Sequence, residues 1–393
     1  MRDWFKVPVL FLFLGAAIGT LMRYHFVMPM KFFSFMHWLH AHSHMMFLGW
    51  ITNLLVLAFL YEWIEAEWKR FRALFIAIQL VILGLTTAFI LQGYGLLSIT
   101  CLALHSIVMF IFCVMFYRRT RHVESESISF ARSALFFFVL STLGAFALGP
   151  ISANNLGHTK WYYFAIFFYL HFQYNGFFTF GILALVFRSF ERNNIPMPEK
   201  RVRLIRLLLL YSCMAAYLLS VIWSDPGVVI QVIAGMAAVA QMIAFFLFIS
   251  LRNDAATTFF KSQGAGVRIL LISAGLAWMM KLVLQLASVV PAVAHLATDV
   301  RFLVLSYLHL VLIGMVTFSL LAWLSTSRII PPIKLPVVVV LLIGFVVTEA
   351  FMALTPLFGG FFSTFMHILF AGALMMLTGF AAPLLSIFRR SAP

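Results

Sequence analysis

The sequence is poor in charge and in cysteine. Only 10% of its 393 residues are charged, whereas 64% are hydrophobic, which is more apolar surface than a soluble domain of this size can bury. The composition therefore excludes a soluble enzyme and, despite a net charge of +15, gives no reason to expect a nucleic-acid partner. The three cysteines, Cys101, Cys113 and Cys213, are scattered without a CxxC pair, so neither a disulfide framework nor a thiolate metal site is predicted.

Long apolar runs dominate the chain instead. Windows of about 20 apolar residues, separated by short polar or basic connections, predict twelve membrane-spanning helices. Their uninterrupted hydrophobicity differs from the alternating pattern of a membrane β-barrel. We expect an all-α polytopic membrane protein, a single twelve-span domain of residues 1–393 in contact with the lipid bilayer. The predicted spans are 7–29, 38–62, 72–93, 97–117, 132–150, 162–188, 204–223, 228–250, 268–290, 302–325, 336–357 and 362–386.

The basic residues are distributed unevenly along this pattern. Of the 27 lysines and arginines, 22 lie at the amino terminus, in the carboxyl-terminal tail, or in the connections that follow even-numbered spans. Basic residues favour the cytoplasmic side of a membrane. The sequence therefore predicts a multi-pass protein of the cytoplasmic (inner) membrane with both termini in the cytoplasm. The remaining cations are Arg23, Lys31, Lys160 and Arg301 on the opposite side and Lys281 within span 9.

Histidines gather at one depth of the predicted bundle. His37, His40, His42 and His44 occupy eight residues at the beginning of the second span. Polar side chains inside a bilayer are costly and usually face the bundle interior, so histidines at one depth suggest a shared site. With the predicted orientation, the outer half of the membrane contains His44, His105, His171, His309 and His367.

Spans 2, 6 and 10 begin with similar sequences. Their spacing of four helices indicates three pseudo-equivalent four-helix arcs. The similar segments are Leu39-His40-Ala-His42-Ser-His44, Tyr169-Leu170-His171-Phe-Gln-Tyr-Asn175-Gly176 and Tyr307-Leu308-His309-Leu-Val-Leu-Ile-Gly314.

Imidazole is a good ligand for haem iron, copper and zinc. His40 and His44 are four residues apart and share a helical face, a spacing that can hold a copper or zinc ion. His42 lies about 200° around the helix from His44, so the two address different sites. Asn175 lies one turn from His171 on the same face and could orient it or a bound ligand. The alternative for each of these histidines is a buried side chain that is hydrogen-bonded within the bundle or relays protons.

The motifs resemble those of a known family. His42-Ser-His44-Met-Met-Phe-Leu-Gly49 resembles the His-x-His-x4-Gly signature of the haem-copper oxidase superfamily, subunit I, and is most similar to its cbb-type oxidase and nitric-oxide reductase branches. The segment from His309 to Gly314 resembles the second half of that signature on helix ten. The segment from His171 to Thr179 is similar to the helix-six segment whose histidine binds the non-haem metal.

The resemblance implies a twelve-helix bundle that binds one or two haems b. His44 and His309 would be the axial pair of a low-spin haem, although the family's helix-two ligand aligns equally well with His40, and His42 would bind a second haem. His171 would bind a haem or, together with His40, anchor a non-haem copper or iron ion. Arg301 would pair with a haem propionate; the alternative is an ordinary loop charge.

The sequence departs from this family in several places. Span 7 contains no histidine, whereas the family has a histidine pair near this helix, so a conventional three-histidine metal site is not expected. The cytoplasmic proton-channel carboxylates are not recognisable, and the complete signature falls in span 2 rather than span 10. The chain therefore resembles a short and divergent member whose non-haem metal site is degenerate.

We expect a haem-b-binding redox protein, an oxidoreductase if it turns over a substrate, that transfers electrons or acts on oxygen or nitric oxide. Cytochrome c or quinol would donate the electrons, and partner subunits would complete the protein. Two alternatives stay open. One is a nitric-oxide stress or sensor protein that binds haem and metal without turnover, and the other is a proton-coupled or metal transporter.

Overall fold

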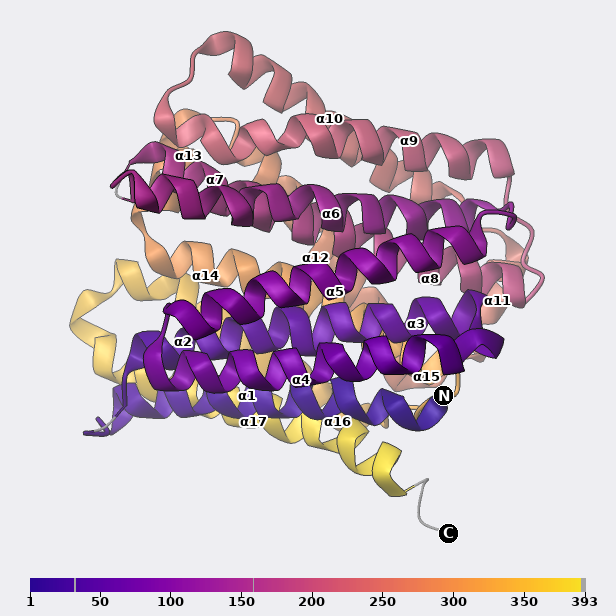
Figure 1. The fold of residues 1–393 in the computed structure, drawn as a ribbon, viewed down its shortest axis with the longest axis horizontal. Helices are drawn as coiled ribbons and strands as arrows, with labels where there is room; N and C mark the ends of the chain where they lie inside the picture. Colours follow the sequence, from indigo (N-terminus) through magenta and orange to yellow (C-terminus); the bar gives the residue numbers. More distant parts are fainter. Residues whose placement is uncertain (32, 158, 390–393) are drawn as a thin grey trace. The chain divides into compact units, whose positions relative to one another are not determined.

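The computed structural model describes residues 1–31, 33–157 and 159–389, and all the regular secondary structure in these ranges is helical (Figure 1). Twelve helical segments in them are long and apolar enough to cross a membrane. This confirms the predicted number and order of the spans, and the chain is a multi-pass helical membrane protein. The segments are Arg2–Val27, Phe35–Trp63, Glu65–Gln92, Leu96–Thr120, Glu126–Ala153, Lys160–Arg192, Glu199–Ser224, Val228–Ser250, Ala265–Ala287, Arg301–Thr326, Leu335–Leu357 and Phe362–Arg389.

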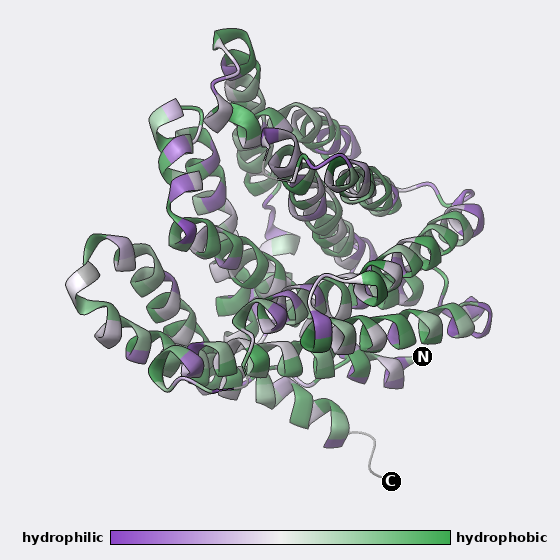
Figure 2. Cartoon of the chain, turned by 60° about the vertical axis from the view of Figure 1, so that its left-hand side comes forward, coloured by the Kyte–Doolittle hydropathy of each residue, from purple (hydrophilic) through white to green (hydrophobic). Residues whose placement is uncertain are grey.

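Hydropathy explains why these segments form spans. Figure 2 shows hydrophobic residues along the lengths of the helices, whereas hydrophilic residues gather mostly near their ends. The spans differ in how deeply they are buried: 83% of the most apolar window is buried in Phe35–Trp63 and in Lys160–Arg192, but only 28% in Leu96–Thr120. The spans that contain His44 and His171 are therefore the most buried of the twelve.

The chain divides into two compact units, and the prediction of one domain stays a prediction. The first unit comprises Met1–His122, Gln263–Leu271 and Leu320–Pro393. It contains η1 (Arg2–Phe5), α1 (Lys6–Val27), α2 (Phe35–His44), η2 (Met45–Thr52), α3 (Asn53–Trp63), η3 (Glu65–Glu67), α4 (Trp68–Gln92), α5 (Leu96–Thr120), α16 (Leu335–Leu354), η7 (Thr355–Leu357), η8 (Gly359–Phe361) and α17 (Phe362–Arg389).

The second unit comprises Val123–Ser262 and Ile272–Ser319. Its connections include two short helices, α11 (Asp254–Ser262) and α13 (Pro291–Asp299), which the sequence analysis did not predict. Two boundaries between the units fall within α12 (Ala265–Ala287) and α15 (Phe318–Thr326), and the other two follow His122 and Ser262. The other helices of this unit are α6 (Glu126–Ala153), α7 (Lys160–His171), η4 (Phe172–Phe178), α8 (Thr179–Arg192), α9 (Glu199–Ala216), η5 (Tyr217–Ser224), α10 (Val228–Ser250), α11 (Asp254–Ser262), α13 (Pro291–Asp299), α14 (Arg301–His309) and η6 (Leu310–Thr317).

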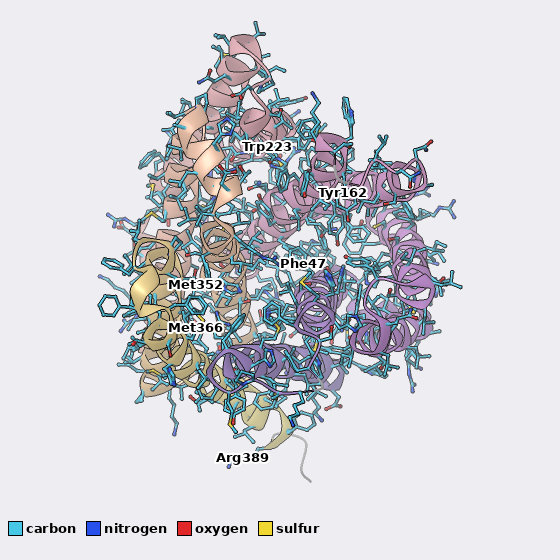
Figure 3. All side chains as sticks on the ribbon, turned by 90° about the vertical axis from the view of Figure 1, so that its left-hand side faces the viewer. Phe47, Tyr162, Trp223, Met352, Met366 and Arg389 are labelled. Atoms are coloured by element: carbon cyan, nitrogen blue, oxygen red, sulfur yellow. The ribbon has the colours of Figure 1, made fainter. Side chains whose placement is uncertain are left out.

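Small residues bring helices close together in both units. In the first unit, Met352 of α16 and Met366 of α17 are buried on neighbouring helices (Figure 3). A Cβ added at Gly344 of α16 would lie 2.6 Å from the carbonyl oxygen of Gly372 on α17. Such close backbone approach is the usual way in which membrane helices associate.

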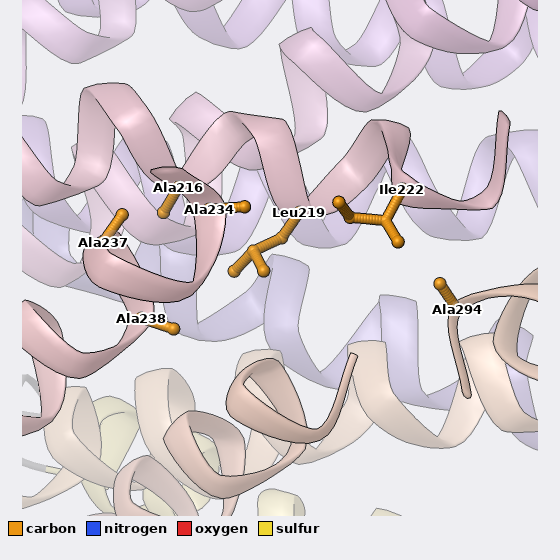
Figure 4. Packing of buried hydrophobic residues seen from close by; sticks show 7 residues of the cluster. All are labelled: Ala216, Leu219, Ile222, Ala234, Ala237, Ala238 and Ala294. Atoms are coloured by element: carbon orange, nitrogen blue, oxygen red, sulfur yellow. The ribbon is translucent and has the colours of Figure 1, made fainter. Parts of the chain in front are cut away.

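In the second unit, an apolar cluster brings two helices close together. Because most of its side chains are alanines, α9 and α10 can pack with little space between their backbones. The cluster, drawn in Figure 4, consists of Ala216, Leu219, Ile222, Ala234, Ala237, Ala238 and Ala294.

Three spans share a local structure that the sequence analysis did not predict. In each, an α-helix ends at a histidine, a π-helix of seven or eight residues follows, and a second α-helix completes the span. The histidines are His44, His171 and His309, so the predicted similarity of spans 2, 6 and 10 extends to their backbone. π-Helical turns inside α-helices are rare and occur often at functional sites, which directs attention to these three junctions.

Candidate functional site

His42 is anchored to the first helix of its unit. Its Nδ1 lies 2.8 Å from the carbonyl oxygen of Gly15 on α1. A carbonyl oxygen only accepts, so Nδ1 carries the proton and the lone pair of the neutral ring lies on Nε2. Gly19 leaves space for the ring, since a Cβ at that position would lie 2.9 Å from His42 Cε1. Gly15 and Gly19 therefore fix both the position and the tautomer of this imidazole.

His40 and His44 face the other side of α2. The Nε2 of His44 is 3.0 Å from the hydroxyl of Tyr94, and its ring stacks on Phe89 with centroids 4.7 Å apart and planes 8° apart. The His40 ring meets the ring of Tyr94 edge-on at 4.5 Å. As the sequence predicts, His40 and His44 share a face, whereas His42 contacts a different helix.

Another buried imidazole of this unit comes from α5. His105 is only 2% exposed, and its Nε2 has no hydrogen-bond partner within the described part of the chain. It interacts electrostatically with His44, as His40 does. The sequence analysis did not include His105 among the site residues, because one histidine in an apolar run carries no spacing signal.

His171 of the second unit has a different environment. Its Nε2 donates to the carbonyl oxygen of Cys213 at 2.8 Å, and its Nδ1 accepts from the side-chain amide of Asn175 at 3.0 Å. This confirms the prediction that Asn175 orients His171. Both ring nitrogens are therefore engaged by the protein, so a ligand role for His171 would require one of these bonds to break. That role stays a prediction.

The residues predicted on span 10 lie in the second unit. Arg301 is exposed at the beginning of α14, and His309 is the last residue of that helix. His44 belongs to the first unit and His309 to the second, so their axial pairing stays a prediction. The same holds for the shared metal site of His40 and His171. No group of three or more histidine, cysteine, aspartate or glutamate side chains in residues 1–31, 33–157 and 159–389 is arranged to hold a metal ion.

A threonine completes the repeated segment and was missed. Each histidine is followed by glycine five residues later and by threonine eight residues later, so the pattern His-x4-Gly-x2-Thr was visible in the sequence. The hydroxyls of Thr179 and Thr317 donate to the carbonyl oxygens five residues earlier, Tyr174 at 2.7 Å and Leu312 at 2.8 Å. These bonds provide hydrogen-bond donors for backbone carbonyl groups at the π-helical turns. The hydroxyl of Thr52 is buried and has no hydrogen-bond partner among the described residues.

The glycines of two repeats admit an aromatic side chain from a neighbouring helix. A Cβ at Gly49 would lie 2.9 Å from the ring of Phe11, and a Cβ at Gly176 would lie 2.5 Å from the side chain of Phe137. The first contact is with α1 and the second with α6. The repeated glycine is thus explained by packing, independently of any ligand.

Comparison with known proteins does not assign the chain to a family. No protein-family model matches the sequence, and no curated protein matches it.

Proposed function

We propose that the protein binds haem b through the histidines of span 2 and takes part in electron transfer or in the chemistry of a small gas such as oxygen or nitric oxide. The observation that carries the proposal is the orientation of His42. An imidazole that ligates a metal usually donates its second N–H to a carbonyl or carboxylate group. His42 makes this bond with Gly15 and carries its lone pair on the opposite ring nitrogen, the atom that would bind iron.

The helix that bears His42 is rich in apolar residues, as a haem pocket requires. Gly19 accommodates the His42 ring itself, since a Cβ at that position would lie 2.9 Å from His42 Cε1. The same helix continues into buried apolar residues, including Phe47 and Trp50, which suit a porphyrin. Haem iron accepts single electrons and binds small gases, whereas the protein would supply the ligand, its orientation and exclusion of water.

Other parts of the proposal come from the resemblance: a second haem or a copper or iron ion, electron donation by cytochrome c or quinol, and partner subunits. Haem content tests the requirement that these parts share. The cytoplasmic membrane with both termini inside is proposed from the distribution of basic residues.

The test is a reduced-minus-oxidised optical spectrum of the purified protein from haem-replete cells, together with extraction of its haem. We expect a sharp low-spin b-type band. Loss of that band in both His44→Ala and His309→Ala would establish the axial pair that the resemblance implies. Replacement of the exposed His122 by alanine is the matched control and should leave the band unchanged.

Two results separate this proposal from its rivals. A colourless preparation without extractable haem contradicts it and favours a transporter. Haem that is present but inert towards quinol, cytochrome c, oxygen and nitric oxide favours a sensor or protective protein without turnover.

A further inference from the structure

A groove lies between two membrane-spanning helices of the second unit. The helices α9 and α10 pack against each other (Figure 1) and leave a groove of about 340 Å³ between them. The small side chains of Ala237 and Ala240 provide the space on the α10 side. Leu204, Tyr211 and Met236 also line the groove and are 46%, 68% and 60% exposed. The groove therefore opens at the surface of the chain, within the part of the helices that the bilayer surrounds.

The length of the groove matches one leaflet of a bilayer. On α9 its lining begins at Leu204 and ends at Ala215, which corresponds to about 16 Å along a helix axis. The hydrocarbon core of a bilayer is roughly 30 Å thick. Beyond Ala215 the two helices are held together by the buried Ala216, Leu219 and Ala234. An acyl chain of one leaflet fits this length, whereas a membrane-spanning helix of a partner would extend well past it.

Two cations stand beyond the other end of the groove. Lys200 and Arg201 precede Leu204 by one turn and lie on the same face of α9, because residues three and four apart are neighbours on a helix. Both side chains are exposed, and neither has an ionic partner among the residues that the structure describes. An apolar groove that ends at two free cations complements a molecule with an apolar chain and an anionic head.

The other charges of this turn do not cancel the two cations. Glu199 lies about 140° around α9 from Leu204, on a different face. Arg206 is used within the protein, since its Nε lies 2.7 Å from the carboxylate of Glu126. Arg203 lies about 100° from Leu204 and adds positive charge beside the groove. The net charge at this end of the groove is therefore positive.

We propose that the groove and the cations Lys200 and Arg201 bind one anionic phospholipid of the adjoining leaflet. One acyl chain lies in the groove, and the phosphate of the headgroup contacts Lys200 and Arg201. Basic residues at the membrane surface attract anionic lipids, and the guanidinium group of arginine matches the geometry of a phosphate. Any lipid can cover an apolar helix face, but only an anionic headgroup gains from the two cations. The inference is independent of haem.

The test is native mass spectrometry of the full-length protein in detergent, with added dioleoyl phosphatidylglycerol or dioleoyl phosphatidylcholine. We expect one phosphatidylglycerol to bind to each chain, and more tightly than phosphatidylcholine. Lys200→Gln combined with Arg201→Gln should weaken phosphatidylglycerol binding at least about tenfold and remove the preference. The matched control combines Lys69→Gln with Arg118→Gln, which changes an exposed lysine and an exposed arginine of the first unit, and should keep it.

A second variant tests the groove itself. Ala240→Trp places a large ring in the groove at a half-buried position. It should weaken the binding of both lipids, because it displaces the acyl chain and leaves the cations in place. Exposed positions are changed in the Lys200 and Arg201 variant, so the headgroup test does not depend on the folding of Ala240→Trp.

Three results overturn the proposal. The first is equal affinity of the unmodified protein for the two lipids, or unchanged lipid binding by Ala240→Trp. The second is a preference that survives the loss of Lys200 and Arg201, or that the control variant also loses, which would indicate diffuse surface charge. The third is a lipid-free dimer of the unmodified protein that Ala240→Trp dissociates, which would assign the groove to a second copy of the chain.

Discussion

Spans 2 and 6 have the same α–π–α backbone but hold their histidines differently. In span 6, Asn175 and the Cys213 carbonyl engage both nitrogens of His171. In span 2, His42 is anchored to the Gly15 carbonyl through Nδ1, which directs its lone pair to Nε2. The comparison teaches that a repeated motif predicts a repeated backbone, whereas the hydrogen-bond partners of the histidine rings differ from one span to the next.

The histidines that end the first α-helix of each span, His44, His171 and His309, also differ in the residue one turn later. The fourth residue after the histidine is Asn175 in span 6, but it is Leu48 in span 2 and Ile313 in span 10. Only the asparagine can donate to the imidazole from the next turn. The apolar residues leave the corresponding ring without this local partner.

The largest expected effect on stability follows from removal of His171. His171→Ala should lower the free energy of unfolding by roughly 3 kcal/mol, because it opens a cavity and leaves the Cys213 carbonyl and the Asn175 amide without their partner. Thermal unfolding in detergent measures this loss. His105→Leu is the matched comparison in the first unit: it removes a buried ring with an unpartnered nitrogen and should change stability much less. Equal losses for the two variants would contradict the distinction between the sites.

A smaller effect distinguishes the repeated threonines. Thr179→Val removes the bond to the Tyr174 carbonyl and should cost about 1 kcal/mol. Thr52→Val removes a buried hydroxyl that has no hydrogen-bond partner within the described residues, so stability should be unchanged or slightly higher. Both changes are nearly isosteric, and the same unfolding experiment compares them directly. A greater loss from Thr52→Val would show that the two π-helical turns are held in another way.

Hydropathy was sufficient to predict the twelve spans, because each is a long apolar run that only a membrane can accommodate. It could not predict the three π-helices, since an apolar run is compatible with either an α-helical or a π-helical turn. The bond between Asn175 and His171 was predictable because it joins residues one turn apart on one helix. The contact of His42 with Gly15 and the position of His105 depend on how separate helices pack. Residue spacing along the sequence does not predict such contacts between helices.

The most direct measurement of the central claim is the haem-to-protein ratio of two purified variants, His42→Ala and His171→Ala. Each ratio is taken on the folded, monodisperse fraction, so that the lower stability of His171→Ala does not enter. If span 2 provides the ligand, His42→Ala should lose most of its haem, and His171→Ala should keep the ratio of the unmodified protein. A His42→Ala protein with its full haem content, beside a His171→Ala protein without haem, would contradict the account.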